Sequence, residues 1–443
     1  MGMIENQWRF SMGRRQALAS LATLVAGSPL LHAQLDPHGV LNGHKRIPSI
    51  DEMTSAFDFE PICFANMTLE RFDYMAHGDG SEYTLRRNRQ AFDWVDIVAG
   101  KAIDPKSVDL SSALLGVPLK YPVYVAPSSG QGALHPDGEV GMYRGAAAAG
   151  AIMAIASGPS KPHPEIAKAA AGARWNQFYP ISDMDLSREA VMQYQDLGTK
   201  AIIITVDQQA SLYERDLHDR NLGGVVRAAG TGRGRGRGGA PAIDPETGQP
   251  IARGGGAGRG GGRGAASPAA TAGSTITPTF PSLSKYRVEN RRLWYNWGYV
   301  DELRKALKVP VIIKGIVTPE DAADCAKQGV DAIIVSNHGG RSMDYGPSTL
   351  EVLPDIVAAV NGRIPVIVDS GFRRGSDVFK ALALGASAVE LGRAARWGLG
   401  AFGAAGTQRL LEIVQQELVQ AAASAGRATL KSIDKTAVKV NFV

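Results

Sequence analysis

The stretch Ala201-Ile-Ile-Ile-Thr-Val-Asp207 is one of several short runs of β-branched and other apolar residues that recur along the chain. A continuous run of this kind, without polar residues at alternate positions, is typical of a strand that is buried on both faces of a parallel sheet. Similar runs lie at residues 122–127, 151–157, 174–179, 310–315, 332–337, 365–369 and 388–393. The sequence therefore predicts eight buried strands.

Helical patterns that end in glycine lie between most of these runs. Examples are residues 139–150, 187–198, 319–329 and 376–385. A glycine at the end of a helix can adopt the left-handed conformation that terminates it. Eight repeats of strand and helix predict a TIM barrel, an α/β fold with a closed parallel sheet. A doubly wound open sheet is the alternative, but that fold seldom uses eight such similar units.

The composition is that of an ordinary globular protein. The 443 residues are 44% hydrophobic and 21% charged, which excludes a wholly disordered chain, a fibre and a multi-span membrane protein. Cys63 and Cys325 are too few for a disulfide scaffold, and no pair of cysteines has the spacing of a zinc site, so we expect no metal. Whether these two cysteines pair is left open.

Glycine and positive charge are concentrated in one segment. Residues 223–273 contain 18 glycines, seven arginines and two acids, which accounts for the whole net charge of +5. No aromatic residue lies between residues 225 and 279. Such a segment cannot bury enough apolar surface to fold alone, so we predict a long disordered Gly/Arg-rich insert after the fourth strand, a flexible lid at residues 223–280. Contact with an anionic surface is an alternative. RNA binding is disfavoured because base-stacking aromatics are absent.

The first residues have the pattern of an export signal. Arg14 and Arg15 precede fifteen uncharged residues, 17–31, and the pattern closes with the small residue Ala33. This arrangement predicts a signal peptide over residues 1–33, too short to span a bilayer comfortably. The paired arginines favour the twin-arginine type, and hence a periplasmic location, over an ordinary signal. Residues 34–110 then form an N-terminal helical extension, and residues 111–443 form the barrel.

The predicted strands end in polar side chains that a core does not need. These are Ser128, Ser129, Ser157, Gln177, Tyr179, Thr205, Asp207, Lys314, Ser336, Asn337, His338, Asp369 and Arg393. In a TIM barrel, the carboxyl ends of the strands carry the active site. Burial of a lysine at the end of the run Val311-Ile-Ile-Lys314 is costly without an anionic partner. We therefore expect a functional site at this rim.

The string Ile334-Val-Ser-Asn-His-Gly-Gly-Arg-Ser-Met-Asp-Tyr345 closely resembles the signature of the FMN-dependent L-2-hydroxy-acid oxidases and dehydrogenases. That family includes glycolate oxidase, lactate oxidase, mandelate dehydrogenase and the flavin domain of flavocytochrome b2. Further motifs follow in the family's order: residues 72–74, 84–89, 126–127, 135–139, 177–179, 205–207, 314–315, 369–375 and 391–393. The resemblance covers residues 60–443 apart from the insert.

The resemblance implies roles for residues around the substrate. His338 is the expected base, because a neutral imidazole titrates near working pH, and Asp207 is expected to hold the imidazole ring. Arg341 suits the substrate carboxylate, since a guanidinium binds carboxylates with two hydrogen bonds. Either Arg215 fills the family's second carboxylate position, or Glu214 replaces it. Tyr74 and Tyr179 resemble the family's two pocket tyrosines.

The resemblance also implies an FMN site. Lys314 is expected at the N1–O2 edge of the flavin, where it stabilises negative charge. Residues expected to contact the ring are Pro127, Ser128, Ser157, Gln177, Thr205 and Ser336. Asp369 is expected at the ribityl hydroxyls. The phosphate is expected at Gly371, Arg373, Gly392 and Arg393, because the loops after the last two strands are a common phosphate site in barrels.

The implied activity is oxidation of a small or medium L-2-hydroxy acid to the 2-oxo acid. Oxygen, a quinone or a cytochrome is the electron acceptor, and the family's habit implies a homo-oligomer such as a tetramer. No nucleic-acid partner is expected, because the chain outside the insert has no net charge. The alternatives are another FMN barrel reaction, such as a lactate monooxygenase or an isomerase, and a non-catalytic protein that binds a surface through the insert. His338 together with Arg341 disfavours the isomerase.

Overall fold

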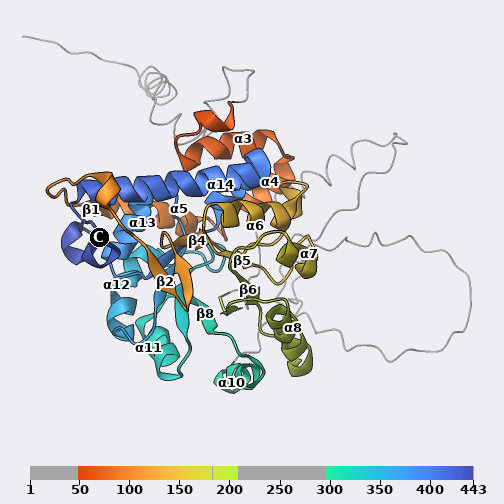
Figure 1. Cartoon of the computed structure of the whole chain (residues 1–443). Helices are drawn as coiled ribbons and strands as arrows, with labels where there is room; N and C mark the ends of the chain where they lie inside the picture. The colour runs from red at the N-terminus through yellow and green to blue at the C-terminus, as the bar shows by residue number, and fades with distance from the viewer. Residues whose placement is uncertain (1–47, 182, 208–295, 443) are drawn as a thin grey trace, which may run out of the picture. The chain divides into compact units, whose positions relative to one another are not determined.

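The computed structural model describes residues 48–181, 183–207 and 296–442 (Figure 1). The expected signal peptide, the Gly/Arg-rich insert, Glu214 and Arg215 lie outside these residues. From Ile50 onward, the described residues form one compact unit.

Eight parallel strands close into a barrel at the centre of this unit (Figure 1). They are β4 (Val123–Val125), β5 (Met153–Ile155), β6 (Arg174–Phe178), β7 (Ile202–Thr205), β8 (Val311–Ile316), β9 (Ala332–Val335), β10 (Val366–Val368) and β11 (Ala388–Leu391). The strands neighbour one another in chain order, and the last pairs with the first, with Val389 opposite Val123. This closure confirms the TIM barrel and excludes the open doubly wound sheet.

Alternate residues of each strand face the inside of the barrel, because side chains of a strand point to opposite faces. Tyr124, Trp175, Ile203, Ile312, Ile334, Ile367 and Ala388 belong to one buried cluster there. The antiparallel hairpin of β2 (Ser112–Leu114) and β3 (Val117–Leu119) adds Leu114, Val117 and Leu119 to the same cluster. The apolar interior is thus sealed where the chain enters the barrel, and the polar strand ends are left at the opposite end.

Helices pack around the barrel strands. Their bounds are α3 (Phe59–Ala65), α4 (Leu69–Ala76), α5 (Tyr83–Gln90), α6 (Gly138–Ala148), α7 (His163–Lys168), α8 (Met184–Asp196), α10 (Trp297–Ala306), α11 (Pro319–Lys327), α12 (Thr349–Val360), α13 (Gly375–Ala383) and α14 (Arg393–Ser424). Short 3-10 helices lie at Ile50–Glu52, Ala56–Asp58, Ala91–Trp94, Pro105–Ser107, Gln131–Ala133, Leu430–Ser432 and Lys435–Ala437. Strands β1 (Val95–Ile97) and β12 (Val438–Val440) pair outside the barrel.

Local sequence signals explain where the helices begin and end. The Thr318 hydroxyl accepts a hydrogen bond from the Asp321 amide, and Pro319 takes the first position of α11, where no donor is needed. The predicted helix-ending glycines Gly150, Gly198, Gly329 and Gly385 all have positive φ angles, between 69° and 103°. This agreement confirms that these glycines stop the helices before the chain turns into the next strand.

The structure also shows the state of the two cysteines and the character of the helices. Cys63 and Cys325 are both buried and unpaired, which answers the question that the sequence left open. Within the part of the chain that the structure describes, no helix combines the length and apolar character needed to cross a membrane.

The crossing of α6 and α14 provides a test of the packing. A Cβ atom on Gly145 would lie 2.4 Å from the Ala404 carbonyl oxygen and 2.6 Å from the Thr407 Cβ. We therefore expect Gly145→Ala to lower the free energy of unfolding by about 1–3 kcal/mol, because neither contact can relax without separating the helices. Gly298→Ala, on the exposed face of α10, is the control and is expected to be neutral or stabilising. Equal losses in urea denaturation would contradict this packing.

Candidate active site

A layer of polar side chains caps the apolar interior at the carboxyl ends of the strands. Thr205 lies opposite Lys314 in the β7–β8 register, and Glu390 lies opposite Tyr124 in the β11–β4 register. Gln177, Thr205, Lys314, Asp369 and Glu390 are all buried, with at most 6% of each residue exposed. We refer to these five residues as the polar layer.

Lys314 is the cation of the polar layer. Its Nζ lies 3.0 Å from Asp369 Oδ2 and donates a 2.6 Å hydrogen bond to Ser336 Oγ. Burial alone would lower the pKa of Lys314, but the negative charges of Asp369, Asp207 and Glu390 raise it overall. The anionic partner that a lysine at this position requires is therefore present, and Lys314 remains charged.

His338 lies on a loop with an unusual backbone. Its φ angle is +58°, and Gly339 and Gly340 follow with φ angles of +68° and +79°. A side chain at Gly340 would place its Cβ 2.6 Å from the Leu85 amide nitrogen, so only glycine permits this approach. Reciprocal hydrogen bonds between Asn337 and Asn88 hold the loop against α5. The strain of a left-handed non-glycine residue is typical of functional sites.

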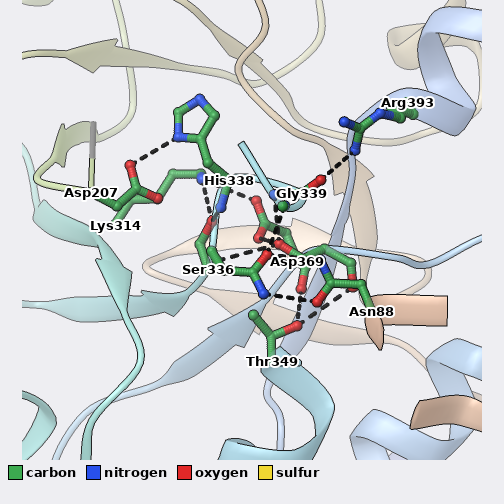
Figure 2. Close-up of polar contacts among 12 residues, drawn as sticks. Asn88, Asp207, Lys314, Ser336, His338, Gly339, Thr349, Asp369 and Arg393 are labelled. Carbon is green, nitrogen blue, oxygen red and sulfur yellow. Dashed lines mark hydrogen bonds and ion pairs between the residues drawn. The ribbon is translucent and has the colours of Figure 1, made fainter. Parts of the chain in front are cut away.

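His338 is paired with Asp207, as Figure 2 shows. The Nδ1 atom of His338 lies 2.8 Å from Asp207 Oδ1. Burial would raise the pKa of Asp207, but the charges of His338 and Lys314 and the hydrogen bond from His338 lower it overall. The carboxylate therefore stays ionised, and it orients the ring so that Nε2 is the nitrogen left for a ligand. Gly315 makes room for the pair, since a Cβ there would lie 2.6 Å from the Asp207 Cβ.

A second group of charges lies on the loop after β10 and at the start of α14, which follows β11. Arg373 and Arg396 are buried, and burial lowers the pKa of Arg393 most, with smaller contributions from the charges of Arg341, Arg373 and Arg396. Burial and the charge of Arg89 lower the pKa of Arg373 to about 10, and its guanidinium stacks 4.5 Å from the Trp397 ring centre. Several mutually repelling guanidinium groups favour an anionic ligand.

Arg393 also ties three segments together. Its guanidinium donates hydrogen bonds to the carbonyl oxygens of Met75 at 2.9 Å, Gly339 at 2.7 Å and His77 at 2.6 Å. The contact with Gly339 is visible in Figure 2. Arg393 thus fixes the C-terminal end of α4 and the residue that follows it against the loop that carries His338.

One cavity connects these groups. The empty space within it, including the part open to solvent, is about 1020 Å³. Its walls are formed by Met75, Pro127, Ser128, Ser129, Ala156, Ser157, Gly158, Gln177, Tyr179, Thr205, Lys314, His338, Gly339, Arg341, Ser370, Gly371, Phe372, Arg373, Glu390, Gly392, Arg393 and Arg396. The expected base, the expected carboxylate ligand Arg341 and most of the expected FMN contacts therefore meet in one space.

Some expected site residues are placed differently. Ser336 and Asp369 are not among the residues that line the cavity and contact Lys314 instead. Asp207 does not line it either, but it makes the contact with His338 that the sequence predicts. The backbone of Tyr74 lies in α4, and Arg215 lies outside the described residues. The expected contact of Asp369 with the ribityl hydroxyls therefore stays a prediction.

The cavity offers polar atoms that fit FMN. Among the described residues, Gln177 Nε2 and Thr205 Oγ1 are buried without a hydrogen-bond partner. A buried polar group without a partner is costly, so these atoms suit the heteroatoms of a bound ring. Lys314 lies opposite Thr205 in the strand register. The arginines of the cavity wall suit a phosphate. Gln177, Thr205 and Lys314 would hold the ring, and Arg373 with Arg396 would hold the phosphate.

Two charged residues of the cavity wall, Glu390 and Arg396, are not predicted from the sequence. Glu390 stands third in the strand Ala388-Val-Glu-Leu391, where the alternation of side chains points it inward with Ala388. Arg396 is three residues after Arg393 in α14, a spacing that places both on one face of the helix. These two signals are present in the sequence, but they are weak without the neighbouring elements.

Comparisons with known proteins agree with this site. The family model for FMN-dependent dehydrogenases matches residues 64–440. Glycolate oxidase 3 of Arabidopsis thaliana is 33% identical over 88% of this chain and 97% of its own length. L-lactate oxidase of a Nostoc species is 32% identical over 87% of this chain and 98% of its own length. A crystal structure of mandelate oxidase with benzoyl-formic acid superposes with a TM-score of 0.69 at 30% identity, covering 88% of this chain and all of that one.

The ion pair of the polar layer can be tested by a double-mutant cycle. We expect Lys314→Met and Asp369→Leu each to lower the free energy of unfolding by about 3–5 kcal/mol, because each leaves a buried charge without its partner. The double variant is expected to lose much less than the sum, since neither charge remains. Additive losses in urea denaturation would show that the two side chains do not interact.

Proposed function

Because the chain belongs to the FMN-dependent dehydrogenase family, we propose that it oxidises an L-2-hydroxy acid to the corresponding 2-oxo acid. The observation that carries this proposal is the 2.8 Å contact of Asp207 with His338 beside a cavity that Lys314 and Arg341 also line. The names of the relatives, which are oxidases of glycolate, lactate and mandelate, support the same class of substrate.

His338 is the proposed base. Nδ1 is engaged by Asp207, so Nε2 receives the proton of the substrate hydroxyl. The ionised Asp207 carboxylate stabilises the protonated ring that results, as the aspartate of a catalytic triad does. The Ser336 hydroxyl accepts a hydrogen bond from the His338 amide, and the Asn337 side chain accepts one from Asn88, so the loop that carries the ring is held in place.

Arg341 is the proposed ligand of the substrate carboxylate, with Tyr179 on the same wall. A guanidinium three residues after the base binds the carboxylate while the hydroxyl carbon lies next to Nε2. When bound, FMN would supply the acceptor for the hydride, that is, the hydrogen and the electron pair that leave the substrate carbon. Lys314 would help to hold the ring and would place a positive charge beside it. Tyr74, Arg215, Ser128, Ser157 and Gly371 are further proposed contacts.

The electron acceptor and the assembly are also proposals. Molecular oxygen is the acceptor that the relatives' names support, since each of them is called an oxidase. A quinone or a cytochrome would leave oxygen consumption low while the acid still reduces the flavin. A homo-oligomer, such as a tetramer, is proposed from the family resemblance alone.

Anaerobic mixing with hydroxy acids tests the proposed function. We expect the purified protein to be yellow and to bleach with at least one L-2-hydroxy acid from a panel that includes glycolate, lactate and mandelate. His338→Ala is expected to retain the flavin and to bleach about 10²–10⁴-fold more slowly, because it lacks the base. The rate is read by stopped-flow absorbance.

Asp207→Asn is the matched variant for this experiment. It keeps the shape of the side chain but cannot stabilise a protonated ring, so its bleaching rate should also fall. A His338→Ala protein that bleaches at the wild-type rate would contradict the assignment of the base. A protein without flavin would contradict the function itself.

We further propose that residues 1–33 export the protein to the periplasm by the twin-arginine route. Paired arginines at positions 14 and 15 before an uncharged stretch support this proposal. Replacing Arg14 and Arg15 with lysine is expected to abolish export of the full chain from a Gram-negative host, as measured by immunoblot of cell fractions. Arg9→Lys is the control. Undiminished export of the double-lysine variant would indicate an ordinary signal peptide instead.

A further inference from the structure

Glu390 is a buried acid that the proposed reaction does not use. It is 1% exposed and lies on β11, between apolar neighbours, with its side chain directed inward. Ala388, two residues earlier on the same face, belongs to the apolar interior cluster. Glu390 itself lines the cavity. A carboxyl group at such a position is costly unless it is neutral or paired.

The titratable groups around Glu390 lie on or directly after four other strands of the barrel, of which only β4 and β10 pair with β11. Tyr124 stands opposite it on β4, Asp369 follows β10, Lys314 lies on β8 and Asp207 follows β7. The polar layer together with Asp207 therefore contains one cation, Lys314, and the three carboxyl groups of Asp207, Asp369 and Glu390. Lys314 pairs directly with Asp369 at 3.0 Å, so its charge is already matched by a closer acid.

Neither carboxyl oxygen of Glu390 meets a partner at good hydrogen-bond geometry within the described part of the chain, although the Tyr124 hydroxyl is close enough to lower the pKa of Glu390. Both of these oxygens and the Tyr124 hydroxyl are buried. Burial raises the pKa of Glu390 to about 8; the charge of Asp369 adds to the increase, whereas Lys314 and Tyr124 oppose it. A neutral carboxylic acid is therefore the stable form at neutral pH, and it carries a hydrogen-bond donor into a cavity wall.

We propose that Glu390 is a further cofactor-tuning residue, which holds a proton at neutral pH and, when it loses that proton at higher pH, opposes reduction of the flavin. The inference rests on the proposed function, because it requires FMN in this cavity. The proton exchanges with solvent, and no other bond changes. Negative charge that arrives on the cofactor is repelled by an ionised carboxylate in the same low-dielectric space, but not by a neutral acid.

The midpoint potential of the bound flavin is the direct readout. Holoenzymes of the wild type and Glu390→Gln are titrated anaerobically at pH 6 and pH 9. The potentials are expected to agree at pH 6, where both side chains are neutral. At pH 9 the wild type is expected to lie at least about 30 mV lower, which is a tenfold change in a two-electron equilibrium.

Two further variants sharpen the test. Tyr124→Phe removes the hydroxyl that favours the ionised form, so the pH at which the potential departs from the Glu390→Gln curve should rise. Glu412→Gln changes an acid on α14 that pairs with Gln408, and it should reproduce the wild-type curve. A difference between the wild type and Glu390→Gln that is the same at both pH values would overturn the proposal. Flavin missing from every variant would instead overturn the proposed function.

Folding stability gives a second readout that does not depend on turnover. The folded protein retains the Glu390 proton up to about pH 8, whereas the unfolded chain releases it near its ordinary value of 4.5. Between these values the folded state binds one more proton, so stability contributed by Glu390 is lost as the pH rises. Relative to Glu390→Gln, the wild-type folding equilibrium constant should fall by up to about tenfold per pH unit. A ratio that is flat from pH 5 to pH 8 would overturn the proposal.

Discussion

The site depends on a lysine that is buried at the end of an apolar strand. Lys314 is 3% exposed, so its charge must be matched from within the barrel. Asp369 at 3.0 Å provides the direct match, and Ser336 accepts a hydrogen bond from the same nitrogen. Ser336 in turn accepts a hydrogen bond from the His338 amide. The position of His338 and the ion pair between Lys314 and Asp369 are therefore linked through the Ser336 hydroxyl.

Much of the fold could be predicted from the sequence because its signals are local and repeated. Most of the barrel strands are short apolar runs rich in β-branched residues, and four of the helices between them stop at a glycine with positive φ. The polar strand ends were informative for a different reason. Parallel strands bring their carboxyl ends to one rim, so His338, Asp207 and Lys314 meet although they are far apart in the chain.

The remaining features depend on tertiary contacts that no single segment encodes. The guanidinium of Arg393 donates hydrogen bonds to three backbone carbonyls of two other segments, and its contact with a phosphate stays a prediction. The Asp369 carboxylate is paired with Lys314, and its contact with the cofactor likewise stays a prediction. The inward direction of Glu390 follows from strand register, and its pKa is raised first by burial and then by the charge of Asp369, which outweigh Lys314 and Tyr124. Residues on different strands decide these properties together.

We conclude that one cavity holds a flavin, with its ring near Lys314 and its phosphate near the arginines that follow β10 and β11. A crystal structure of the protein with FMN tests it most directly. The account predicts the ring against Gln177, Thr205 and Lys314, with the phosphate at Arg373 and the imidazole of His338 facing the ring. A flavin bound elsewhere, or an imidazole turned away from it, would contradict the account.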